Sequence, residues 1–82
     1  MAQQYANQQI KIRTSILVFI KGGAAPLVLY VDKPHELYEE LQQLMRSGAN
    51  IFVERDANGP LKKVAFMSGQ IAGLALQDEQ YV

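Results

Sequence analysis

The residues best suited to chemistry in this sequence of 82 residues are one histidine and a short run of glutamates. His35 is the only histidine and the chain has no cysteine. A histidine site needs further metal ligands or a nucleophile at a recognisable spacing, and neither accompanies His35. The spacing of Glu36, Glu39 and Glu40 is typical of the solvent-exposed face of a helix. We therefore predict no catalytic residue, no metal ligand and no cofactor, and a protein that is not an enzyme.

A glycine pair after Lys21 raises the question of a phosphate-binding loop. Gly22 and Gly23 follow an apolar run but lead into Pro26 and a second apolar run, whereas a phosphate-binding loop opens a helix. Neither the dinucleotide fingerprint nor the P-loop spacing occurs. Glycines that can adopt positive φ, followed by a proline, are typical of a turn between strands.

Basic residues gather before Asp32, where the chain carries Lys11, Arg13 and Lys21 and no acid. Beside an aromatic side chain, such residues could bind nucleic-acid bases and phosphates on a sheet surface. The formal net charge is zero, however, so the protein lacks the general attraction to phosphates that nucleic-acid binders usually show. Nucleic-acid binding is therefore the alternative function and not the first.

One stretch, Asp32 to Gly48, has the start, body and end of a helix. Asp32 or Lys33 can form the N-cap and Pro34 fits the first turn, where a missing N–H costs nothing. Gly48 can adopt the left-handed conformation that ends a helix. The residues of the apolar stripe have helical spacing and predict a face packed on a sheet: Leu37, Tyr38, Leu41, Leu44 and Met45.

Alternating and β-branched residues predict strands on both sides of this helix. We expect two strands before it, at Ile10 to Ile20 and Leu27 to Val31, and two after it, at Ile51 to Glu54 and Lys62 to Met67. The sequence Asp56-Ala57-Asn58-Gly59 is a strong turn signal that joins the second pair. Ile71 to Leu76 is either a short fifth strand or a bulged continuation of the fourth, and we take the first.

These elements predict one α+β domain, a small mostly antiparallel sheet packed against a single helix. The order is β-β-α-β-β with a short last strand, and residues 1–9 and 78–82 are expected to be loose tails. The composition is that of a globular protein, with 49% apolar and 20% charged residues. Its apolar runs are too short to cross a bilayer as helices. The start of the chain lacks a signal-peptide pattern, so we expect a cytoplasmic protein.

The predicted function follows from what the helix leaves uncovered. A sheet with one helix has a second face, and its free edges expose N–H and C=O groups. We therefore predict a small non-catalytic interaction or regulatory module that acts through a sheet face or edge, as a homodimer or with a protein partner. The candidate interaction surface comprises Lys11, Arg13, Phe19, Tyr30 and Phe66.

Residues 37–76 resemble part of a small uncharacterised protein family of cyanobacteria. The resemblance rests on Leu37-Tyr38, Met45-Arg46-Ser47-Gly48, Lys62-Lys63-Val64-Ala65 and Ile71, and covers about half of the chain. It implies a cytoplasmic cyanobacterial protein. It implies no catalytic residues and no mechanism.

Overall fold

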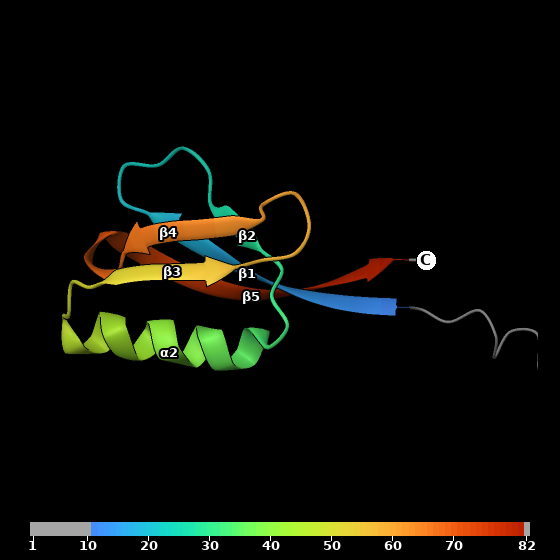
Figure 1. The fold of residues 1–82 in the computed structure, drawn as a ribbon, viewed down its shortest axis with the longest axis horizontal. Helices are drawn as coiled ribbons and strands as arrows, with labels where there is room; N and C mark the ends of the chain where they lie inside the picture. Colours follow the sequence, from blue (N-terminus) through green and yellow to red (C-terminus); the bar gives the residue numbers. More distant parts are fainter. Residues whose placement is uncertain (1–10, 82) are drawn as a thin grey trace, which may run out of the picture.

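The computed structural model describes residues 11–81 and shows strands on both sides of one helix (Figure 1). The predicted α+β class, with a helix packed against small antiparallel sheets, is confirmed. The predicted loose segment 1–9 lies outside the described residues. The elements are, in chain order, β1 (Lys11–Ile20), β2 (Leu27–Leu29), α2 (Pro34–Ser47), β3 (Phe52–Asp56), β4 (Lys63–Met67), the 3-10 turn η1 (Ser68–Gln70) and β5 (Ile71–Tyr81).

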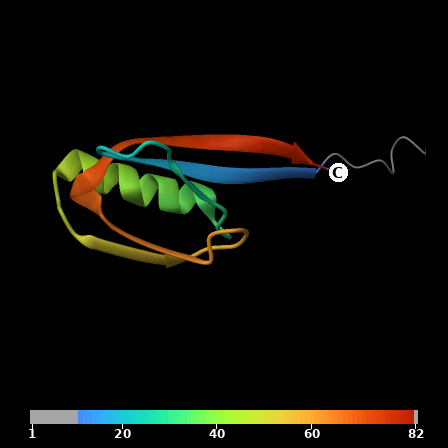
Figure 2. The same ribbon diagram turned by 90° about the horizontal axis from the view of Figure 1, so that it is seen from above.

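The strands form two antiparallel sheets and not the single sheet that the sequence predicts. One sheet has the order β2-β1-β5 and the other is the hairpin β3-β4. Figure 2 shows the hairpin on one side of the molecule and β1 with β5 on the other, and Figure 1 shows α2 running alongside both sheets. The helix therefore closes one side of a two-layered structure, because both sheets have an apolar inner face that needs cover.

The last strand is the longest element of the three-stranded sheet, so the prediction of a short strand ending at Leu76 is wrong. β5 has 11 residues and pairs with β1 from Ile71 opposite Ile20 to Tyr81 opposite Lys11. Residues 78–81, predicted as loose, belong to this strand. They lack apolar alternation, but polar residues of β1 face them: the Thr14 hydroxyl donates to Asp78 Oδ1 at 2.7 Å.

The helix matches its prediction at both ends. Its N-cap is Lys33, one of the two residues expected there, and Pro34 lies in the first turn. Gly48 adopts φ 74° and its N–H donates to the Met45 carbonyl at 3.3 Å. In the stripe, Leu37 and Leu41 are buried. No helix in the described part is long and apolar enough to cross a membrane.

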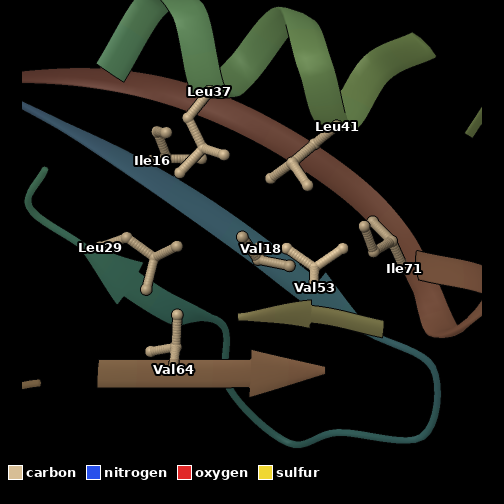
Figure 3. Packing of buried hydrophobic residues seen from close by; sticks show 8 residues of the cluster. All are labelled: Ile16, Val18, Leu29, Leu37, Leu41, Val53, Val64 and Ile71. Atoms are coloured by element: carbon tan, nitrogen blue, oxygen red, sulfur yellow. The ribbon is translucent and has the colours of Figure 1, made fainter. Parts of the chain in front are cut away.

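The core lies between the two sheets, and every strand contributes to it (Figure 3). In the figure, Leu37 and Leu41 point from the helix toward side chains of both sheets. Burial of such side chains contributes roughly 1.5–3 kcal/mol each, so this cluster is the main source of stability. The buried residues are Ile16, Val18, Leu29, Leu37, Leu41, Val53, Val64 and Ile71.

The turn of the β3-β4 hairpin fastens the two sheets together at Tyr30. The Asn58 N–H donates to the Tyr30 carbonyl at 2.6 Å, which forms an isolated antiparallel bridge. Gly59 has φ 91°, and a Cβ there would lie 3.0 Å from the Tyr30 ring. Only glycine fits such a conformation beside a ring without strain.

Candidate interaction surface

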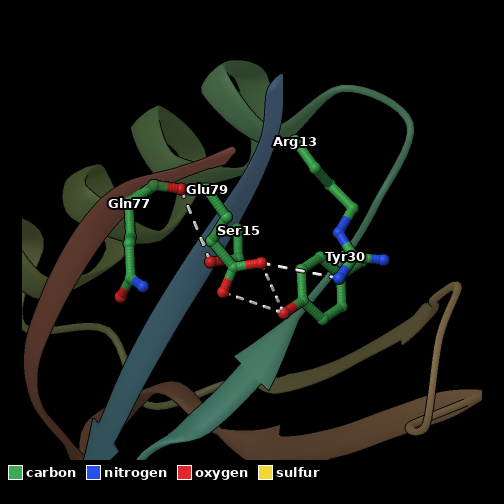
Figure 4. A network of polar contacts seen from close by, with 5 residues as sticks. All are labelled: Arg13, Ser15, Tyr30, Gln77 and Glu79. Atoms are coloured by element: carbon green, nitrogen blue, oxygen red, sulfur yellow. Dashed lines mark hydrogen bonds and ion pairs between the residues drawn. The ribbon is translucent and has the colours of Figure 1, made fainter. Parts of the chain in front are cut away.

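Two residues of the predicted surface, Arg13 and Tyr30, meet in a polar cluster on the outer side of the three-stranded sheet (Figure 4). The Arg13 guanidinium lies 3.9 Å from the centroid of the Tyr30 ring and 3.5 Å from Glu79 Oε1. The Tyr30 hydroxyl donates to the Glu79 carboxylate, 3.0 Å from Oε1 and 3.2 Å from Oε2. Nearby, the buried Ser15 hydroxyl donates to the Gln77 carbonyl at 3.5 Å. The carboxylate offsets the Arg13 charge, so the cluster is not a basic patch.

The hydrogen bond to Glu79 raises the pKa of Tyr30 above its ordinary value, and desolvation and the negative charge of Glu79 add to this shift. The Arg13 charge opposes the shift. A raised pKa in the folded state means that the neutral phenol stabilises the fold below pH 10. That contribution is lost as the pH rises through the folded pKa.

We therefore predict that Glu79→Gln lowers the pKa of Tyr30, because the variant removes the carboxylate that accepts its proton. Ultraviolet titration of phenolate absorbance measures the change, with Tyr30→Phe identifying the signal of this tyrosine among the four in the chain. Thr14→Val is the control, since it acts on Asp78 and not on Glu79. An unchanged Tyr30 pKa in Glu79→Gln would contradict the hydrogen bond from the Tyr30 hydroxyl to the Glu79 carboxylate.

The remaining residues of the predicted surface lie apart from this cluster. Lys11 and Phe19 lie near the two ends of β1, on the same face of the strand as Arg13. At the first end Lys11 and its neighbour Ile12 are both exposed. Phe19 is 40% exposed. Phe66 is different, because it is partly buried and packs against the core. The five residues of the predicted surface thus lie on two different sheets, with Phe66 on the core-facing side of the hairpin.

A more exposed apolar group lies on the outer face of the β3-β4 hairpin. Phe52 and Met67 are 62% and 37% exposed, and Phe52 is directly opposite Met67. We name these two residues the hairpin patch. Their alternation with Val53 and Phe66, which face the core, could have revealed this outer face, but only once the hairpin was known to form its own layer.

The comparisons with known proteins add no assignment. No family model matches this chain, and neither the curated proteins nor the solved structures contain a significant match. The resemblance to a cyanobacterial family therefore stays a prediction.

Two of the hollows on the described surface lie at the start of α2 and beside β2. One of about 350 Å³ lies at the start of α2, between Asp32, Glu36 and the ion pair of Arg55 with Glu40. Residues 11–81 contain no group of three or more carboxylate or histidine side chains that could hold a metal ion. Another hollow, of about 450 Å³, is mostly apolar and lies beside β2, against Pro60 and Leu61. Neither brings a nucleophile to a base.

Proposed function

We propose that this protein is a small non-catalytic interaction module that self-associates through the surface of its β3-β4 hairpin. The hairpin patch carries this proposal, because Phe52 and Met67 lie directly opposite each other on the outer face of the hairpin and both are exposed. Exposed apolar groups of this kind on a small domain mark surfaces for protein association. The sequence predicted a sheet face or edge for this role, and the hairpin offers both.

The projecting ends of β1 and β5 are less suitable for pairing between two copies. Figures 1 and 2 show these ends extending beyond the helix and the hairpin. The end of β1 carries Lys11 and Arg13, and the end of β5 carries Asp78 and Glu79. Two-fold pairing of either projecting end with its own copy brings like charges together, which is destabilising.

No observation favours the alternative of nucleic-acid binding. Arg13 lies against Tyr30 and Glu79, and Lys21 lies at the opposite end of β1 from Lys11. The three basic residues therefore do not form one patch. Salt-dependent binding to mixed oligonucleotides would be the measurement that revives this alternative, because phosphate contacts release counterions.

We predict that Met67→Lys weakens self-association about tenfold or more, which corresponds to about 1.4 kcal/mol. The variant replaces an apolar side chain of the hairpin patch by a charge that is costly to bury. Sedimentation velocity or light scattering over a range of concentrations measures the dissociation constant.

Phe19→Lys is the matched control. Phe19 is 40% exposed and Met67 37%, and both are apolar residues of strands, but Phe19 lies on the other sheet. We expect Phe19→Lys to associate like the unmodified protein. If Phe19→Lys dissociates the protein and Met67→Lys does not, the interface is the three-stranded sheet. A protein that stays monomeric at every concentration overturns the proposed function.

A further inference from the structure

The backbone of β4 has a row of hydrogen-bonding groups that point away from the hairpin. The Ser68 N–H donates to the Ile51 carbonyl at 2.8 Å, and the Lys62 carbonyl accepts from the Ala57 N–H at 2.7 Å. Both groups point toward β3. Because direction alternates along a strand, the N–H and C=O groups of Lys63, Ala65 and Met67 point outward. β4 is an edge strand, so within residues 11–81 these groups face no other strand.

We propose that β4 pairs with β4 of a second copy, antiparallel about a two-fold axis through Ala65. In this register Ala65 faces Ala65 of the second copy, and Lys63 faces Met67 of the second copy. Each of these pairs can exchange two hydrogen bonds, so every outward-pointing group of β4 is satisfied. The arrangement is self-complementary, as a two-fold interface requires, and makes one four-stranded sheet from the two hairpins.

The side chains of this strand suit the register. Ala65 is small and exposed, so two copies meet at the axis without crowding. Lys63 has Met67 of the second copy opposite it and keeps its own Asp56 at 3.7 Å, so no like charges face each other. Met67 belongs to the hairpin patch and becomes covered on one side by the second copy.

The other free edges are less suitable. Figure 1 shows α2 on the side of the molecule where β3 and β5 have their outer edges. β2 has only three residues and follows Pro26, which has no N–H to donate. Its edge also meets Asn58 at Tyr30. β4 therefore has the accessible edge with a complete row of outward-pointing groups.

This inference rests on the proposed self-association, and an engineered disulfide tests it separately. The chain has no cysteine, so Ala65→Cys introduces one thiol. Facing residues of this kind have Cα atoms about 5.5 Å apart, within the range of about 4.4–6.8 Å that a disulfide spans. Glu54→Cys is the matched control, because Glu54 pairs with Ala65 within the hairpin. In the proposed four-stranded sheet, residue 54 of one copy lies three strand spacings, about 14 Å, from residue 54 of the other.

The experiment oxidises each full-length variant mildly, at a concentration where the unmodified protein associates. We expect Ala65→Cys to shift to twice its mass on non-reducing electrophoresis and Glu54→Cys to stay at single mass. If the protein associates but Ala65→Cys does not cross-link, or Glu54→Cys cross-links equally, the β4 register is wrong and the proposed function stands. If the unmodified protein does not associate, both are overturned.

Discussion

Leu41→Ala should lower the free energy of unfolding by about 2–5 kcal/mol. Leu41 is fully buried and points from α2 into the space between the two sheets (Figure 3). Its removal leaves a cavity bordered by side chains of separate layers, which cannot close without moving the helix. A domain of this size has a total stability of roughly 4–12 kcal/mol, so the variant loses a large part of it.

Urea unfolding followed by circular dichroism measures this loss, with Gln43→Ala as the control. Gln43 is exposed on the same helix, and alanine keeps the helix propensity, so its stability should change little. A loss below about 1 kcal/mol for Leu41→Ala would mean that the helix does not pack against the core between the two sheets, because truncating a buried leucine costs more than this.

Ser68→Ala should have the second-largest effect, a loss of about 1–3 kcal/mol for each polar group left unsatisfied in the interior. The Ser68 side chain is 2% exposed. Its hydroxyl donates to the Ala49 carbonyl at 2.7 Å and accepts from the Ile51 N–H at 2.9 Å. The Ser68 hydroxyl thus connects the segment between α2 and β3 to the turn between β4 and β5.

Ser47→Ala is the matched control for this prediction. The Ser47 hydroxyl also bonds two backbone groups, the Leu44 carbonyl at 3.0 Å and the Ala49 N–H at 3.2 Å. Ser47 is exposed, so water can replace its hydroxyl and the stability should fall by less than about 1 kcal/mol. Equal losses in the two variants, measured by thermal unfolding, would contradict the burial of Ser68.

The helix and the strand pairs nearest in sequence were predictable, because their signals are local. Pro34 and Gly48 fix the two ends of α2, and the turn at residues 56–59 defines the β3-β4 hairpin. The pairing of β1 with β5 was not predictable, since it joins residues separated by up to 70 positions. Its polar half, where Thr14 bonds Asp78, has no apolar pattern to reveal a strand.

The candidate interaction surface was likewise predictable only in part. Alternation along β1 placed Arg13 and Phe19 away from the core, and Tyr30 was predicted on the same face. The contact of Tyr30 with Glu79 depends on β5, so no spacing rule could find it. Phe66 packs partly against the core because the hairpin turns one face toward a second layer, and this leaves Phe52 and Met67 exposed on the opposite face.

The sequence by itself determined the class of this protein, the bounds of its helix, and the absence of any recognisable catalytic or metal-binding motif. These follow from composition, capping residues and short periodic patterns, which act within a few residues of one another. Only the tertiary structure decided that the strands form two layers, that the end of the chain is a long strand, and which apolar residues remain exposed. Those outcomes depend on contacts between distant segments, because each segment buries whichever face its neighbours can cover.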